Sequence, residues 1–293
     1  MYTLLTETRR PGAVLVGVDP SAGAKAALDW AVCEARLRDA PLLIAHSWNH
    51  LDYELPEALT RTIGDSTFRA AATFLEDIAA GVRATAPGLK IDTVLLSEAP
   101  TDGLISLAEN AAVLVVGRRG RGDLLAPLLG SVSHRLVAHA PVPVVVVPHT
   151  TTGTAAPAGG TVVVGVAREA PAPVGFAFAE AEAQGAPLLA VRAWTLPSPY
   201  TVASEEAAAA LDADESAELD TLLADARTMR PAVPVTTRVA FGAPDQVLLE
   251  AAADATMIVL GRHRLHHRTG LLLGTVPQRV LHRAEAPVAV VPN

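Results

Sequence analysis

The feature that most constrains the fold is that this chain repeats itself once along its length. Four short apolar blocks recur in the same order, with residues 14–18 answered by 162–166, 41–48 by 187–194, 113–117 by 256–261 and 143–148 by 287–292. Half of 293 residues is the size of a whole domain, far beyond the roughly 20–50 residues of a solenoid repeat. We predict two tandem domains, at 11–148 and 161–293, joined by a linker at 149–160.

Within each copy, short apolar runs alternate with amphipathic patterns. The run at 14–18 has no polar alternation, which is typical of a strand covered on both faces, and apolar residues at helical spacing follow it. This alternation predicts an α/β fold of two tandem, doubly wound parallel sheets of five strands, with ligands beyond the carboxyl ends of the strands. In the first copy we predict strands at 14–18, 42–45, 91–96, 113–116 and 144–147, and helices over 24–35, at 68–82, from an N-cap at Thr101 to Glu109, and at 131–139.

Composition excludes several classes of protein. A net charge of −8 and a pI near 5.6 argue against general binding to nucleic acid or to an anionic membrane. No apolar run approaches the roughly 18–20 residues that span a bilayer, and the N-terminus lacks the apolar core of a signal peptide. Cys33 is the only cysteine, which excludes an intramolecular disulfide and fits a reducing compartment. We therefore expect a soluble, cytoplasmic protein.

A glycine-rich segment follows the fourth predicted strand. Gly117 and Gly120 come directly after the strand, where a backbone can approach a ligand closely or adopt a positive φ. Gly130 and Ser131 then open a helix, whose N–H groups and dipole favour a phosphate, and the hydroxyls of Ser131 and Ser133 offer further donors. The chain's only lysines are Lys25 and Lys90, so the segment is not a Walker P-loop. It predicts a phosphate cradle.

These residues carry a resemblance to a known family. The pattern Gly-x2-Gly-x9-Gly-[Ser/Thr] after the fourth strand, Asp19 at the end of the first strand and a final Val-rich strand ending in Pro resemble the universal stress protein family, here of the tandem type. The resemblance implies an ATP-binding regulatory module of the stress response, without dedicated catalytic turnover and with Mg²⁺ beside the nucleotide. The first copy departs from the pattern at Glu98, where a glycine is usual.

The resemblance also implies which residues bind ATP. Asp19 matches the aspartate near the ribose and the metal. The other matching positions are Gly17, Val18 and Ser47 beside the adenine, Gly117, Arg119 and Gly120 around the ribose and phosphates, and Gly130, Ser131, Val132 and Ser133 at the triphosphate. An alternative interpretation is that the glycines only form turns and that Asp19 only caps the first helix.

The second copy lacks three of these groups. Ala167 stands where the first copy has Asp19, Arg264 replaces Gly120, and Pro277 replaces Ser133. A carboxylate, a close-approach glycine and a hydroxyl are therefore missing, which predicts a weak or absent nucleotide site. Alternatively, Arg264 supplies positive charge to a different anionic ligand.

Two rival functions remain open at this point. One is a slow ATPase or phosphotransferase, although the sequence shows no acid/base pair and no lysine near the cradle. The other is an interaction protein that binds no nucleotide. The final strands at 144–147 and 288–291 are uncharged and β-branched, as edges that pair with another strand are. The resemblance implies that they pair antiparallel, in a pseudo-twofold monomer or a homodimer.

Overall fold

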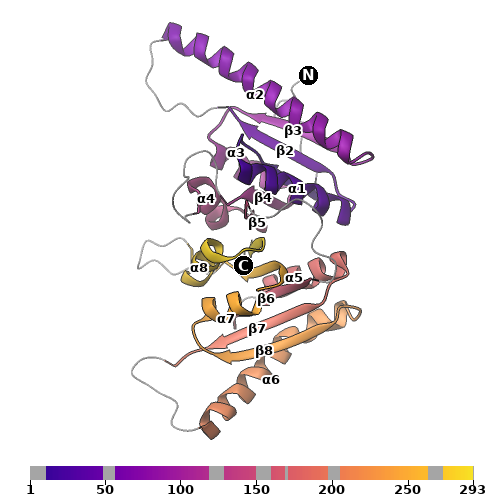
Figure 1. Cartoon of the computed structure of the whole chain (residues 1–293), viewed down its shortest axis with the longest axis vertical. Helices are drawn as coiled ribbons and strands as arrows, with labels where there is room; N and C mark the ends of the chain where they lie inside the picture. Colours follow the sequence, from indigo (N-terminus) through magenta and orange to yellow (C-terminus); the bar gives the residue numbers. More distant parts are fainter. Residues whose placement is uncertain are drawn as a thin grey trace. The chain divides into compact units, whose positions relative to one another are not determined.

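The chain divides into two compact units, which we call the first unit (Met1–Thr154) and the second unit (Ala155–Asn293). The computed structural model describes residues 11–48, 57–118, 129–149, 160–168, 171–196, 205–262 and 273–292. Figure 1 shows that strands and flanking helices alternate along the chain in each unit.

The first unit contains a parallel sheet of five strands. Its strands lie in the order β3-β2-β1-β4-β5, and every described pairing between neighbours is parallel. The bounds are β1 (Ala13–Gly17), β2 (Leu42–Ser47), β3 (Ile91–Leu96), β4 (Ala111–Gly117) and β5 (Val144–Val147). All six residues of β2 are buried, because helices cover both faces of a doubly wound sheet.

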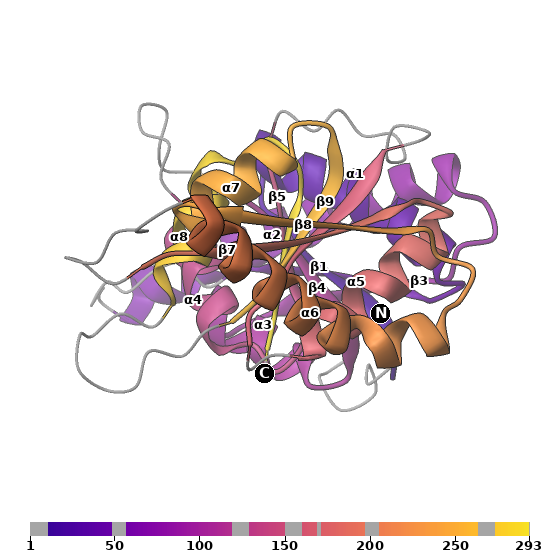
Figure 2. The same ribbon diagram turned by 90° about the horizontal axis from the view of Figure 1, so that it is seen from below.

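Among its described residues, the helices of the first unit are α1 (Ala22–Leu37), α2 (Glu57–Thr85), α3 (Pro100–Ala108) and α4 (Ser131–His139). Helix α1 packs on β1 and β4, and α2 packs on β2 and β3 (Figure 1; Figure 2 gives the view from below). Helices α3 and α4 contact each other, and right-handed crossovers place them on the opposite face of the sheet.

The second unit repeats this architecture. Its strands lie in the order β10-β9-β6-β7-β8, again with parallel neighbours, so β6 corresponds to β1 and β9 to β4. The bounds of its elements are β6 (Thr161–Gly165), α5 (Pro171–Gln184), β7 (Leu188–Trp194), α6 (Glu205–Met229), β8 (Val235–Phe241), α7 (Pro244–Ala251), β9 (Ala255–Gly261), α8 (Thr275–Arg283) and β10 (Val288–Val291). The predicted fold class, two tandem doubly wound α/β sheets, is confirmed.

Two details of the predicted helices are wrong. Helix α3 begins at Pro100, with Ala99 as its N-cap, and Thr101 lies inside the helix. The fixed φ of proline suits the first helical position, so Pro100 rather than a hydroxyl side chain marks this helix start. Helix α2 also begins earlier than its predicted start at Phe68. By contrast, β3, α4 and β5 have the predicted bounds.

The strand order locates the site of each unit. In the first unit the chain moves from β1 outward to β2 and β3, and then returns to the other side of β1 for β4 and β5. The carboxyl ends of β1 and β4 therefore lie side by side at the point where the order reverses, which is where open α/β sheets bind ligands. Among the helices that the structure describes, none is long and apolar enough to cross a membrane.

Candidate functional site

The carboxyl end of β1 presents a fixed carboxylate. Asp19 is half-exposed, and the Ser21 hydroxyl donates a hydrogen bond to its Oδ1. Ser21, not Asp19, is the N-cap of α1, because its Oγ accepts the Ala24 N–H at 3.1 Å. The interpretation of Asp19 as a helix cap is therefore wrong. Its carboxylate is oriented by the cap residue and lies at the edge where a ligand would bind.

Gly117, the last residue of β4, is a glycine for a reason that the sequence did not reveal. A Cβ on Gly117 would lie 2.5 Å from the backbone carbon of Gly23 and 3.0 Å from the Ala24 nitrogen. Its φ is not in the left-handed region. The close approach that requires glycine here is therefore the packing of the start of α1 against the end of β4, rather than a turn.

The start of α4 presents backbone donors beside that strand end. The Gly130 N–H donates to the Arg118 carbonyl at 2.9 Å, and the first helical bond runs from the His134 N–H to the Gly130 carbonyl. The N–H groups of residues 131–133 therefore lack an intrahelical acceptor, and Gly130 provides no side-chain cap. Ser131 is exposed and Val132 half-exposed. This arrangement suits an anion.

Ser133 and Ser47, both predicted to contact the ligand, donate their hydroxyl hydrogens to backbone carbonyls of the protein. Ser133 is buried and donates to the Gly117 carbonyl at 2.8 Å, which ties α4 to β4. Ser47 is buried and donates to the Glu98 carbonyl at 2.6 Å, which ties β2 to the segment after β3. The hydroxyl of Ser133 is thus not a donor toward a phosphate as arranged here, and its backbone N–H is the group that remains.

His46 lies at the same end of the sheet, and the sequence did not single it out. Its Nδ1 lies 2.7 Å from the Val18 carbonyl oxygen, and its ring packs edge-on against Phe74 of α2, with 4.9 Å between the ring centroids. The available signal was an imidazole that follows four apolar residues in the same strand.

Three predicted positions lie outside the described residues, namely Arg119 and Gly120 of the first unit and Arg264 of the second. Within the described part of the chain, no group of three or more His, Cys, Asp or Glu side chains could hold a metal ion. Asp19 beside a metal therefore stays a prediction that rests on one carboxylate.

The second unit repeats the backbone of the site without its functional groups. The Val166 N–H donates to the Val191 carbonyl at 2.9 Å, as the Val18 N–H does to the Ala45 carbonyl in the first unit, also at 2.9 Å. The next residue is Ala167, which has no carboxylate. Helix α8 has an uncapped Gly274 at its start, but Pro277 has no N–H, so its first turn offers one donor fewer than that of α4.

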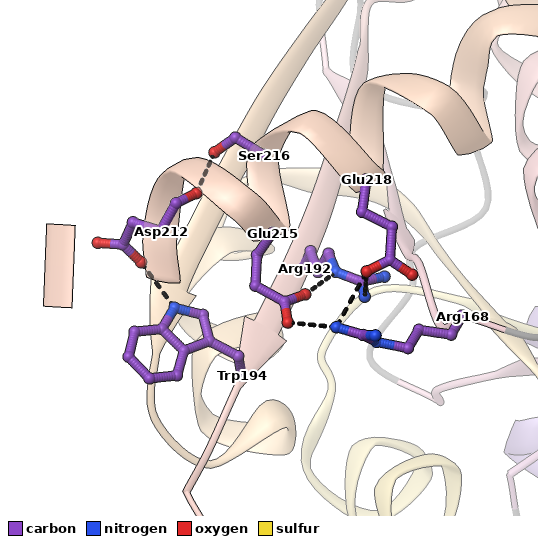
Figure 3. Close-up of polar contacts among 7 residues, drawn as sticks. All are labelled: Arg168, Arg192, Trp194, Asp212, Glu215, Ser216 and Glu218. Atoms are coloured by element: carbon purple, nitrogen blue, oxygen red, sulfur yellow. Dashed lines mark hydrogen bonds and ion pairs between the residues drawn. The ribbon is translucent and has the colours of Figure 1, made fainter. Parts of the chain in front are cut away.

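A cluster of four charged side chains lies at the carboxyl end of β7, and we call it the α6 cluster. It comprises Arg168, Arg192, Glu215 and Glu218 (Figure 3). Arg192 occupies the strand position that His46 has in the first unit and is only 4% exposed. Its Nε bonds Glu215 and its Nη2 lies 3.0 Å from Glu218, while the Arg168 Nη2 lies 2.6 Å from Glu215 and 2.9 Å from Glu218.

The α6 cluster is balanced in charge. Burial acts to raise the pKa of Glu215, but hydrogen bonds from Arg192 and Arg168 outweigh it and hold that pKa below its ordinary value. The hydrogen bond to Glu215 likewise raises the pKa of Arg168. Nearby, the Trp194 Nε1–H donates to Asp212 at 2.6 Å (Figure 3). Two guanidinium groups and two carboxylates therefore neutralise each other where the first unit presents Asp19 and His46.

Comparison with known proteins places both units in one family. The sequence profile of the universal stress protein family matches residues 12–148 and again 160–292. A universal stress protein of Mycolicibacterium smegmatis is 34% identical over 292 residues, covering 95% of this chain and 96% of that one.

Solved structures with TM-scores of 0.60 to 0.67 agree on the fold. A universal stress protein from Archaeoglobus fulgidus aligns with a TM-score of 0.67 at 18% identity, covering 96% of each chain. A universal stress protein solved in complex with cAMP is 28% identical over 46% of this chain and 98% of its own length, with a TM-score of 0.37.

Proposed function

The chain belongs to the universal stress protein family, and on that premise we propose that its first unit binds ATP with Mg²⁺ at the carboxyl ends of β1 and β4. The observation that carries the proposal is the uncapped start of α4. Its first N–H groups have no intrahelical acceptor and are held beside the end of β4 by the Ser133–Gly117 and Gly130–Arg118 hydrogen bonds. A polyphosphate supplies the acceptors that these donors lack.

In the proposed site, different residues contact the ribose, the adenine and the phosphates of the nucleotide. Asp19 faces the ribose and provides the carboxylate oxygen that Mg²⁺ prefers. The remaining contacts are Gly17, Val18 and Ser47 on the adenine side, Gly117, Arg119 and Gly120 around the ribose and phosphates, and the start of α4 (Gly130, Ser131, Val132 and Ser133) on the triphosphate. Ser133 acts there through its backbone N–H, because its hydroxyl bonds Gly117.

We propose a regulatory function in the stress response rather than enzymatic turnover, carried out in the cytoplasm. In this proposal nucleotide binding changes the surface that the first unit offers to a partner. The second unit takes no adenine nucleotide, because Ala167 provides no carboxylate and the α6 cluster lies at the end of β7.

The proposal is tested by the rise in melting temperature that saturating ATP with Mg²⁺ produces in nucleotide-stripped protein. Asp19→Asn should abolish most of that rise. The matched control is Asp29→Asn, because Asp29 lies on α1 in an exposed ion pair with Lys25 and away from the strand end. Wild-type protein whose melting temperature does not respond to ATP, or an Asp29→Asn variant that loses the response equally, would contradict the proposal.

A further inference from the structure

The hydrogen bond that His46 makes within the protein determines that its Nδ1 carries a proton. His46 is 6% exposed, in the penultimate position of β2, and its Nδ1 lies 2.7 Å from the Val18 carbonyl oxygen. A carbonyl oxygen only accepts hydrogen bonds, so Nδ1 must carry the proton of this pair.

This bond completes the anchoring of the peptide groups around Val18. The Val18 N–H donates to the Ala45 carbonyl at 2.9 Å, and the Val18 carbonyl accepts from His46. Val18 comes directly after the last residue of β1, so both bonds hold the chain at the point where it leaves the sheet. Asp19 is the next residue, and its carboxylate is held from the other side by the Ser21 hydroxyl.

The imidazole of His46 also packs against an aromatic side chain of α2. The ring of Phe74 meets it edge-on, with a centroid distance of 4.9 Å and an interplanar angle of 63°. A chain of contacts therefore runs from α2 through His46 to the Val18 carbonyl and on to the backbone of Asp19.

The second unit shows the same backbone without this arrangement. The bond from the Val166 N–H to the Val191 carbonyl is kept, but the position of His46 is taken by Arg192, whose guanidinium pairs with Glu215 and Glu218 of α6. The residue that follows Val166 is Ala167, so this unit has no carboxylate to place.

We propose that His46 is a positioning residue for nucleotide binding in the first unit. Its Nδ1–H bond to Val18 sets the direction in which the chain leaves β1 and so places the Asp19 carboxylate for the ribose and the metal. His46 acts through Val18 and does not touch the nucleotide. This inference rests on the proposed function of the same site.

Two nearly isosteric variants, His46→Asn and His46→Leu, test the proposal. Both lose the ring contact with Phe74, but the asparagine amide places an N–H donor where Nδ1 stands and leucine does not. We expect His46→Asn to keep the Kd for ATP within about threefold of wild type and His46→Leu to raise it about tenfold, the scale of one hydrogen bond. Calorimetry gives the Kd, and circular dichroism without nucleotide verifies that each variant is folded.

The outcomes separate the possible failures. Equal ATP affinities in the two folded variants would overturn the proposal, because the donor would then make no difference. Wild-type protein that binds no adenine nucleotide would overturn the proposed function first, and the inference would fall with it. If His46→Leu does not fold, long-range ¹⁵N NMR of the wild-type imidazole decides: we expect the proton on Nδ1, and a neutral ring protonated only on Nε2 would overturn the proposal.

Discussion

The two units have the same architecture but different side chains at the corresponding strand ends. Each has five parallel strands in the same order, and the backbone bonds at Val18 and Val166 have the same length. The side chains just beyond differ, since Asp19 is matched by Ala167 and His46 by Arg192. The backbone of the site is therefore common to both units, and we propose that a few side chains at the strand ends decide which unit binds a nucleotide.

The two units also differ in the helix that follows the second strand of each sheet, which is α2 in the first unit and α6 in the second. In the first unit, α2 brings the apolar ring of Phe74 against His46. In the second unit, α6 brings the carboxylates of Glu215 and Glu218 to Arg192, so charges of its own chain satisfy that strand end (Figure 3).

The largest expected effect concerns the α6 cluster. Arg192→Ala removes a nearly buried guanidinium and leaves Glu215 and Glu218 with Arg168 alone. Breaking a buried ion pair costs about 3–5 kcal/mol, and partial exposure of both glutamates reduces this to about 2–3 kcal/mol of unfolding free energy for the second unit. Urea unfolding followed by tryptophan fluorescence measures it, in a background where Trp30 and Trp48 of the first unit are replaced by phenylalanine so that Trp194 alone reports.

Arg227→Ala is the matched control, because Arg227 lies on α6 in an exposed pair with Asp220 at 2.9 Å. It should cost less than about 1 kcal/mol. Equal losses in the two arginine variants would show that the α6 cluster does not stabilise the second unit.

The next effect concerns the donors at the start of α4. Ser133→Pro gives the first unit the residue that the second unit has at Pro277 and removes one backbone N–H. A hydrogen bond to a charged group contributes about 1.5–3 kcal/mol, so ATP affinity should fall roughly 10- to 100-fold in calorimetry. Ser133→Ala removes the hydroxyl and keeps the N–H, and should retain most of the affinity. Loss of equal size in the alanine variant would assign the effect to the Ser133–Gly117 bond instead.

A smaller effect concerns the pH dependence of the second unit. The folded-state pKa of Glu215 lies below its ordinary value of 4.5, so its ion pairs contribute stability above that pH and lose it as the pH falls through the lowered pKa. The stability advantage of wild type over Glu215→Gln should therefore be constant near neutral pH and shrink below about pH 4.5. Urea unfolding at a series of pH values measures this difference. An advantage that grows on acidification would contradict the assignment.

The smallest expected effect is that restoring two of the missing groups to the second unit does not create an ATP site there. Ala167→Asp with Pro277→Ser restores a carboxylate and a donor to the second unit, but Arg192 and the α6 cluster stay in place. We expect no second ATP site in calorimetry. A second site in this double variant would show that the α6 cluster is no obstacle to binding.

Most of the fold was predictable from local pattern, and part of the site was not. The apolar run at 144–147 fixes its strand, and the glycine before Ser131 marks the start of α4. The N-cap at Thr101 was wrong because Pro100 already occupies the first helical turn. The reason for Gly117 was hidden, because it depends on how closely α1 approaches β4.

The side-chain partners at the strand ends were also hidden. His46 bonds a carbonyl 28 positions earlier in the chain, and Arg192 pairs with Glu215, 23 positions later. Local periodicity reports which face of an element a residue occupies, but not which distant polar group it meets. The replacement of Asp19 by Ala167 was readable by aligning the two copies, whereas the α6 cluster needed the structure.

We propose that one unit binds nucleotide and the other does not. Calorimetric titration of the nucleotide-stripped protein with ATP in Mg²⁺ buffer tests this by giving the number of sites per chain. We predict one site, lost in Asp19→Asn. Two sites per chain, or one site that survives Asp19→Asn, would contradict it.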